Sequence, residues 1–124
     1  MTMHSCIPII PSMDLEKSLR LWRDGLGFEV RPFAHKEDRL TGCMLSNGHL
    51  MFMLNIRAGA PEKPNDYEGI RLYWAPENLT ELWSKLRSLG FDVSEITKRD
   101  YGHTEFFLVD DDGFDHCFGV ASSA

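Results

Sequence analysis

Two stretches of the chain carry apolar residues at intervals of three and four, the spacing of one face of a helix. The first stretch follows Asp14 and comprises Leu15, Leu19, Trp22 and Leu26. The second follows Asn78 and comprises Leu79, Leu82, Leu86 and Leu89. Asp and Asn commonly cap helix N-termini, and glycine commonly ends a helix. We therefore predict one helix from Asp14 to Gly25 or Gly27, and another from Asn78 to Gly90.

The two helices belong to an internal repeat. The segment 26–30 (LGFEV) nearly matches 89–93 (LGFDV), 63 residues further on, whereas the two helix starts lie 64 residues apart. A short apolar strand precedes each helix, at 7–10 and 70–74, and a hairpin with a turn signal follows it. The turns are Ser46-Asn47-Gly48 and Asp110 to Gly113, residue types that favour tight turns. The order strand, helix, strand, hairpin thus occurs twice.

This order predicts an α+β domain over residues 1–124, built of two tandem βαβββ modules. We place module one at 1–57, a linker rich in Pro and Gly at 58–68, module two at 69–120 and a short tail at 121–124. One helix cannot cover both faces of four strands, so the modules must pack together into a curved mixed sheet. Such a sheet leaves a concave cup, a form that suits small ligands.

Charge and cysteine content exclude several classes of partner. The chain has 13 basic and 19 acidic residues and a formal net charge of −6, which disfavours nucleic acid and anionic membrane. Its longest apolar run, 50–54, is far too short to span a bilayer. Three widely spaced cysteines without a CxxC pair suit free thiols in a reducing compartment. We see no signal peptide pattern and expect a cytoplasmic protein.

Three stretches of the chain resemble the vicinal oxygen chelate superfamily, which includes glyoxalases, bleomycin-resistance proteins and extradiol dioxygenases. They are the opening strand and helix at 7–19, the helix end and second strand at 22–30, and the closing hairpin at 101–113. The closing hairpin departs from the usual DPDG pattern, because Asp111 replaces the proline. The resemblance implies the two-module fold. It does not imply one activity, because the superfamily includes isomerases, lyases, transferases, dioxygenases and non-catalytic drug binders.

The resemblance also implies where a metal would bind in catalytic members, at one inward position in the first and last strand of each module. Here those positions fall on Ile7, Phe52, Arg71 and Cys117. Ile and Phe have no donor atom, and the guanidinium of arginine stays protonated. A shift of one residue brings in Met51, Met53 or His116 and is no better. We predict no metal and no other cofactor, as in the bleomycin-resistance-like branch.

Strand alternation predicts which side chains line the cup. Ile10, Met51, Met53, Leu72 and Trp74 are assigned to the faces that pack against the helices. His103 is placed at the rim, and Arg71 is expected to pair with Glu105 or with an acidic group on the ligand. The sequence does not fix the register of the final hairpin, so the phenylalanine that faces the cup is either Phe106 or Phe107. The predicted ligand-binding residues are Ile7, Phe33, Phe52, Leu54, Arg71, Tyr73, His103, Phe106 and Cys117, and Ile9 is expected beside them.

The sequence thus favours a homodimeric binding protein that holds an aromatic or amphipathic small molecule without turning it over, for sequestration or antibiotic resistance. Exposed strand edges and an apolar concave face are the reason to expect a dimer. One alternative is a metal-dependent lyase, isomerase or dioxygenase of the same superfamily. Another is a structural or regulatory dimer whose cup is filled. The sequence leaves open whether the modules pair within one chain or between two.

Overall fold

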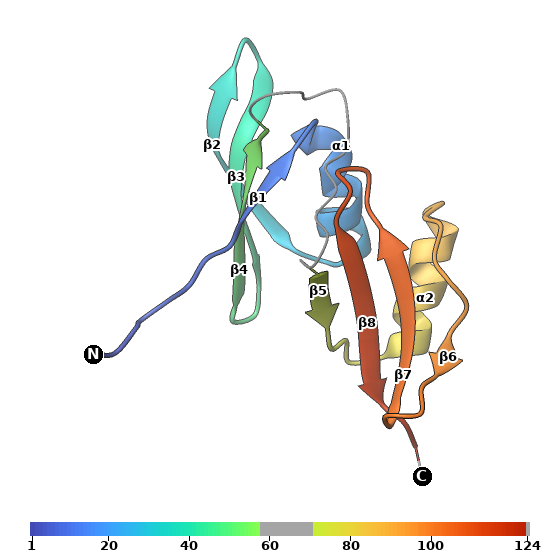
Figure 1. Cartoon of the computed structure of the whole chain (residues 1–124). Helices are drawn as coiled ribbons and strands as arrows, with labels where there is room; N and C mark the ends of the chain where they lie inside the picture. The colour runs from blue at the N-terminus through green and yellow to red at the C-terminus, as the bar shows by residue number, and fades with distance from the viewer. Residues whose placement is uncertain (58–70, 124) are drawn as a thin grey trace. The chain divides into compact units, whose positions relative to one another are not determined.

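The computed structural model describes residues 1–57 and 71–123. The chain divides into two compact units, Met1–Pro64 and Asn65–Ala124, which are described separately. Each unit carries one helical segment and one four-stranded sheet (Figure 1). The predicted linker at 58–68 lies outside the described residues. No helix in the described ranges is long and apolar enough to cross a membrane.

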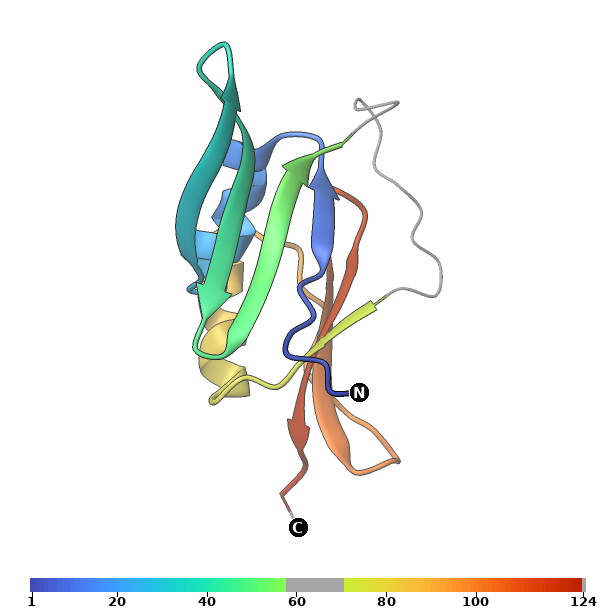
Figure 2. The same ribbon diagram turned by 90° about the vertical axis from the view of Figure 1, so that its left-hand side faces the viewer.

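The first unit comprises β1 (Ile9–Ser12), α1 (Leu15–Leu19), the π-helix η1 (Arg20–Gly25), β2 (Glu29–Lys36), β3 (Arg39–Asn47) and β4 (Leu50–Ile56). Its strands lie in the order β1-β4-β3-β2. Strand β1 is parallel to β4, and the other neighbours are antiparallel. The helical segment covers one face of this sheet (Figure 2).

The second unit repeats this connectivity. It comprises β5 (Arg71–Trp74), α2 (Leu79–Ser88), β6 (Thr97–Lys98), β7 (His103–Val109) and β8 (Asp115–Ala121). The order is β5-β8-β7-β6, with β5 parallel to β8. The predicted succession of strand, helix, strand and hairpin is therefore confirmed in both units.

Both predicted helix starts are confirmed, because each predicted cap residue accepts a hydrogen bond from a backbone amide of its helix. The Asp14 carboxylate accepts a hydrogen bond from the Lys17 amide at 3.2 Å, and the Asn78 side chain accepts one from the Glu81 amide at 3.0 Å. Both caps satisfy an amide that has no partner within the first turn of the helix. Past the helix ends, Gly27 and Gly90 take positive φ values of 77° and 90°, which glycine adopts without strain.

The π-helix explains why the repeat offset changes from 64 to 63 residues between the helix start and the helix end. The first helical segment is one residue longer than the second, and Arg20–Gly25 forms the wider turn of a π-helix. Within it the Leu26 amide donates to the Leu21 carbonyl, five residues back, at 2.7 Å. Such a turn takes up one extra residue without changing which face meets the sheet.

The core of the first unit contradicts part of the predicted cup. Phe52 and Leu54 lie beneath the helical segment, where the ring centroids of Phe52 and Trp22 are 5.2 Å apart. Ile10 pairs with Leu54 and Ile9 with Met53, so the methionines of β4 share the opposite face with Ile9. The predicted faces of β4 were thus exchanged, and Phe52 and Leu54 do not line an open face.

Unequal turn lengths cause this error of one residue. The two predicted positions, Phe52 and Cys117, each lie four residues beyond a turn glycine, Gly48 or Gly113. The β3–β4 turn has only Gly48 and His49 between its strands, whereas the β7–β8 turn spans 110–114. Pairing of Ile9 with Met53 and of Tyr73 with Cys117 makes Met53 the counterpart of Cys117.

In the second unit, Phe106 is also on the helix side. It is fully buried and stacks on Phe118 with ring centroids 4.8 Å apart. Phe107, which pairs with Cys117, is on the opposite face. Of the two phenylalanines, Phe107 therefore lies on the face away from the helix, and the prediction of Phe106 as a ligand contact is wrong. The predicted helix-side assignment of Leu72 and Trp74 agrees with their pairing to His116 and Phe118.

The Asp110–Gly113 turn is held by a buried histidine. The Trp74 indole donates to Nδ1 of His116 at 3.0 Å, which leaves Nε2 to donate to Asp110 Oδ2 at 2.7 Å. The other carboxylate oxygen of Asp110 accepts the amides of Asp112 and Phe114, each at 2.9 Å. These contacts give the acidic turn a structural role, as its composition predicts.

Candidate functional site

The face of the second sheet that is turned away from α2 collects polar and aromatic side chains. We call it the open face of the second unit. By pairing and alternation it carries Arg71 and Tyr73 from β5, His103, Glu105 and Phe107 from β7, and Asp115, Cys117 and Gly119 from β8. Four of the predicted ligand-binding residues, Arg71, Tyr73, His103 and Cys117, are thus brought to one face.

Glu105 is the centre of this face. Its side chain is only 1 % exposed, although it carries a carboxylate. The Tyr73 hydroxyl donates to Oε2 at 2.7 Å, and the Tyr101 hydroxyl donates to Oε1. The Arg99 Nε atom lies 3.5 Å from Oε1 as an ion pair rather than a well-formed hydrogen bond. We call these four residues the glutamate cluster.

The cluster keeps the buried carboxylate ionised. Burial by itself raises the pKa of Glu105 and is the largest single effect. Hydrogen bonds from Tyr101 and Tyr73, together with the positive charge of Arg99, outweigh burial and leave the pKa below its ordinary value. A buried charge is therefore satisfied entirely by neighbours within this unit.

Gly119 makes the position of Tyr73 possible. A Cβ atom at Gly119, which pairs with Glu105 across the strands, would lie 2.3 Å from the Tyr73 hydroxyl oxygen. Because glycine leaves this space, the phenol reaches over the strand to Glu105 while the residue stays 55 % exposed. The ring is thus anchored at its hydroxyl and accessible elsewhere, which is a preorganised surface for a ligand.

Neither hydroxyl nor thiol on this face is set up as a nucleophile. Burial, and then the hydrogen bond to Glu105, raise the pKa of Tyr73 to about 12. Burial, and then the nearby Glu105 charge, raise the pKa of Cys117 to about 11. The thiolate is the form of cysteine that attacks substrates and binds metals. At neutral pH Cys117 therefore contributes a thiol to the wall of the site.

Arg71 has a different partner from the one expected. Its Nε atom lies 3.6 Å from Oδ2 of Asp115, and both side chains are well exposed. Glu105 instead pairs with Arg99. The expectation that Arg71 pairs with Glu105 is wrong, and Arg71 is not a buried cation that requires an acidic ligand. An exposed ion pair of this kind contributes little stability.

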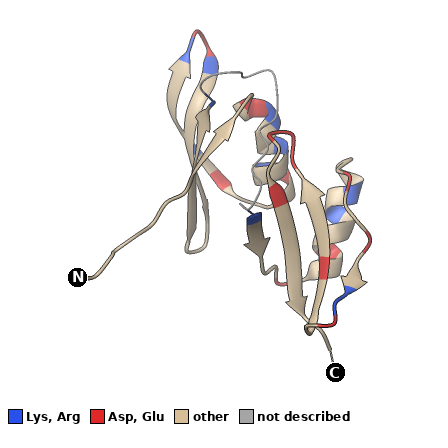
Figure 3. Ribbon diagram, in the orientation of Figure 1, with Lys and Arg blue, Asp and Glu red and all other residues tan. Residues whose placement is uncertain are grey.

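The open face of the first unit is more apolar, although Arg31, which pairs with Met44, shares it. Ile9 and Phe33 are well exposed, and Met44, Met51 and Met53 share their face of the sheet. Phe33 lies over Gly42, where a Cβ atom would come within 2.6 Å of its ring. Ile7 precedes β1 and is partly exposed. In Figure 3 the strands of this sheet are free of charge along β1 and β4, and charged residues lie on β2, at the β2–β3 tip and on α1.

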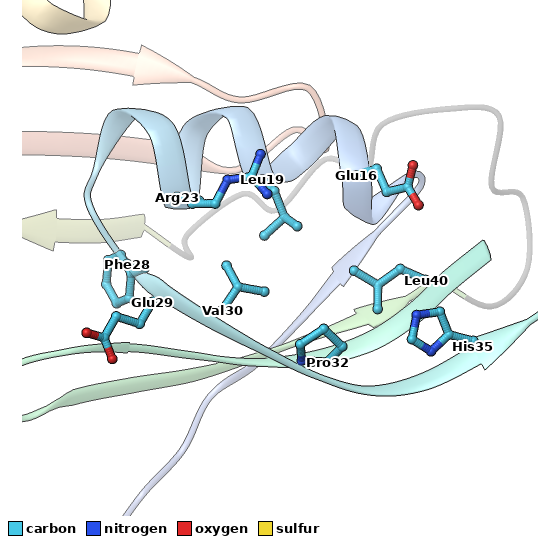
Figure 4. A pocket seen from close by; sticks show the side chains of 9 residues that line it. All are labelled: Glu16, Leu19, Arg23, Phe28, Glu29, Val30, Pro32, His35 and Leu40. Carbon is cyan, nitrogen blue, oxygen red and sulfur yellow. The ribbon is translucent and has the colours of Figure 1, made fainter. Parts of the chain in front are cut away.

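A cleft of about 870 Å³ lies between α1 and β2 in the first unit (Figure 4). Its centre is apolar, with Leu19, Val30 and Leu40 facing one another. Glu29 lies toward one end, and Glu16 and His35 lie toward the other. Arg23 also lines it and is paired with Asp24 at 2.8 Å. The charged groups at its rim are exposed, so the cleft lacks the fixed, buried polar anchor that the glutamate cluster provides.

The comparisons with known proteins identify the family. The family described as the glyoxalase/bleomycin resistance protein/dioxygenase superfamily matches residues 3–118. The chain belongs to this superfamily. No curated protein matches the sequence.

Solved structures of the superfamily share the fold with this chain at low sequence identity. A bleomycin-binding protein complexed with bleomycin is 18 % identical, with a TM-score of 0.68 over 97 % of this chain and 100 % of that one. A glyoxalase family protein from Enterococcus faecalis is 20 % identical, with a TM-score of 0.77 over 97 % and 100 %. A bleomycin resistance determinant of transposon Tn5 is 19 % identical, with a TM-score of 0.64 over 98 % and 100 %. They support the α+β fold of two βαβββ modules.

The metal positions implied by the superfamily do not suit a hard divalent cation in this chain. With the corrected register they are Ile7, Met53, Arg71 and Cys117. These residues offer no carboxylate or imidazole, and the Cys117 thiol is protonated. Within 1–57 and 71–123, no three His, Cys, Asp or Glu side chains are grouped so as to hold a metal ion.

Sequence reasoning missed three members of the site. Arg99 and Tyr101 belong to the loop before β7, where strand alternation does not apply. Gly119 lies in β8 on the same face as Cys117, but it has no side chain and was not considered as a cup residue. Glu105 was noticed only as a partner for Arg71. The available signal was a single acidic residue in the otherwise apolar segment 105–109, where an inward carboxylate needs partners.

Proposed function

We propose that this protein binds a small organic molecule without a metal, on the open face of its second unit. The observation that carries the proposal is the buried Glu105 carboxylate, which fixes two exposed phenol rings by their hydroxyl groups. Ordering these groups before a ligand arrives lowers the entropic cost of binding. Tyr73, Tyr101, His103, Arg71 and Cys117 would contact the ligand, which is aromatic or amphipathic.

The chemistry of the face favours holding a ligand over converting it. The protonated Tyr73 and Cys117 supply no nucleophile at neutral pH, and the superfamily's metal positions have unsuitable donors. Glu105 is buried, each of its two oxygens already accepts a phenol hydroxyl, and Arg99 is paired with it, whereas Asp115, also on this face, is paired with Arg71. A general base needs a free lone pair directed at its substrate.

We propose a sequestering role of the drug-resistance type, because the similar structures include a bleomycin-binding protein and a bleomycin resistance determinant. Ile7 and Phe33, in the first unit, remain proposed contacts for a ligand on that unit's own sheet. A cytoplasmic homodimer is also proposed, because β1, β2, β5 and β6 are edge strands of their sheets and two sheet faces carry exposed apolar side chains. The net charge of −6 argues against nucleic acid as a partner.

A ligand screen with matched variants tests the proposal. Compounds that raise the melting temperature of the wild type are titrated by calorimetry against Tyr73→Ala, Arg71→Ala and Thr80→Ala. Thr80 is exposed on α2, on the other side of the sheet from the open face, and is the control. We expect Tyr73→Ala to weaken binding by about 1 kcal/mol or more. Equal affinity in all variants would place the ligand elsewhere. Elemental analysis that finds one divalent metal per chain, with a chelator-sensitive activity, would instead support the metal-dependent enzyme.

A further inference from the structure

Three aromatic rings surround the buried carboxylate on the open face of the second unit. The rings of Tyr73 and His103 meet edge to face, with centroids 6.4 Å apart and planes at 89°. The rings of Tyr101 and His103 are 6.0 Å apart and tilted by 42°. Both phenols end on the two oxygens of the same Glu105 side chain. The two phenols therefore share one negative charge, and the His103 ring lies beside both of them.

This arrangement is electron-rich. The faces of aromatic rings carry partial negative charge and attract cations. A phenol that donates its proton to a carboxylate gains electron density in its ring, because the hydroxyl bond is polarised toward the acceptor. The open face already shows the interaction, since the Arg99 guanidinium carbon lies 5.1 Å from the centre of the Phe107 ring.

The formal charges that face the rings cancel. Glu105 is offset by Arg99, and Arg71 is offset by Asp115 at 3.6 Å. No buried, unpaired cation among the described residues of this face demands an acidic ligand. The chain as a whole carries a net charge of −6, which favours the approach of cations.

We propose that Tyr73, Tyr101 and His103 form an aromatic cage for an organic ammonium group, with Glu105 as its counter-charge. The inference rests on the proposed binding function and names its ligand class, a small molecule with a quaternary or tertiary amine. The rings stabilise the cation through their faces, and its methyl groups bury apolar surface against them. Arg71 is a neighbouring like charge that limits the affinity.

The test compares three probes of one shape and three charges. Choline carries a trimethylammonium group, dimethylbutanol replaces that group by neutral tert-butyl, and dimethylbutanoate joins the tert-butyl group to a carboxylate. Dissociation constants are measured by amide chemical-shift titration of the full chain. We expect choline to bind about fivefold or more tighter than dimethylbutanol, the ratio typical of a partly exposed cation–π site. Dimethylbutanoate should bind weakest.

Variants assign the effect to the cage. Leucine has no aromatic ring to attract a cation. Tyr73→Leu should therefore remove the preference for choline, so that choline and dimethylbutanol bind alike. Arg71→Gln should tighten choline, because it removes a like charge from an exposed site. Thr80→Ala, on α2 and away from the open face, should leave all three affinities unchanged. Amide spectra of each variant, recorded without probe, show whether the second unit is still folded.

Each outcome decides between the proposals. Equal binding of choline and dimethylbutanol at this face overturns the cage but leaves the binding function standing. Preference for dimethylbutanoate, lost in Arg71→Gln, shows an anion site and also overturns the cage. No shift with any probe up to solubility overturns the cage as well. The broader proposal then depends on the compound library, whose hits must map to this face for it to stand.

Discussion

Replacing Gly119 by alanine tests whether the phenol of Tyr73 is held where the structure places it. The new Cβ would lie 2.3 Å from the phenol oxygen and 3.0 Å from Cζ, so the ring must move. Moving it breaks the 2.7 Å hydrogen bond to a carboxylate that is 1 % exposed. A hydrogen bond to a charged group contributes about 2 kcal/mol, and alanine in place of glycine in a strand returns about 0.5 kcal/mol. The expected net loss of unfolding free energy is about 1.5 kcal/mol.

The same substitution should cost almost nothing once Tyr73 is absent. In a Tyr73→Ala background, the nearest atom to the new Cβ is Glu105 Cγ, at 3.1 Å, and small adjustments relieve that contact. The four proteins of the cycle, unfolded in urea, should show a coupling energy of about 1.5 to 2 kcal/mol between the two positions. Additive effects, within about 0.5 kcal/mol, would refute the placement of the phenol over Gly119.

The first unit supplies a matched control. A Cβ at Gly42 would lie 2.6 Å from the Phe33 ring, a contact that, like the 2.3 Å contact at Gly119, forces the ring to move. Phe33 is 54 % exposed and has no hydroxyl group to anchor it, so its ring can turn away into solvent. We expect Gly42→Ala to cost less than about 0.5 kcal/mol. The difference between the two glycines then isolates the hydrogen bond to Glu105.

Two further predictions concern ionisation. The lowered pKa of Glu105 contributes stability above the ordinary glutamate pKa of about 4.3, and this contribution is lost as pH falls through the lower folded value. Urea midpoints from about pH 6 to about pH 2 should therefore fall less steeply for Glu105→Gln than for the wild type, and parallel curves would contradict this. A thiol reagent at neutral pH should label exposed Cys6 first, because Cys43 and Cys117 are buried and burial raises the pKa of both; equal labelling rates in the native protein would contradict it.

Local signals in the sequence were sufficient for the helices and the repeat. Asp14 and Asn78 cap their helices through their own side chains, and a cap of this kind depends on only three or four consecutive residues. The turn at Asn47-Gly48 was equally predictable from local sequence. In the structure Gly48 has a φ of 58°, which suits glycine. Such features do not depend on what the rest of the chain does.

Strand faces were harder to predict, because each depends on one counted position. An error of one residue reverses every side chain in a strand. The two hairpin turns differ in length, so counting from their glycines exchanged Phe52 with Met53. The glutamate cluster was harder still. It joins β5, β7 and the loop before β7, and only the tertiary pairing of β5 with β8 and β8 with β7 brings those segments together.

The π-helix at Arg20–Gly25 makes this segment unusually tolerant of a shortened chain. Deleting one residue from an ordinary helix rotates everything beyond the deletion by about 100° and turns its apolar stripe away from the sheet. Here a deletion can be absorbed by closing the wide turn to an α-helical one, which leaves Leu19 on one side and Phe28 on the other in their present positions. The first module would then have a helix of the same length as the second. Natural length variants of this module should therefore cluster in these six residues.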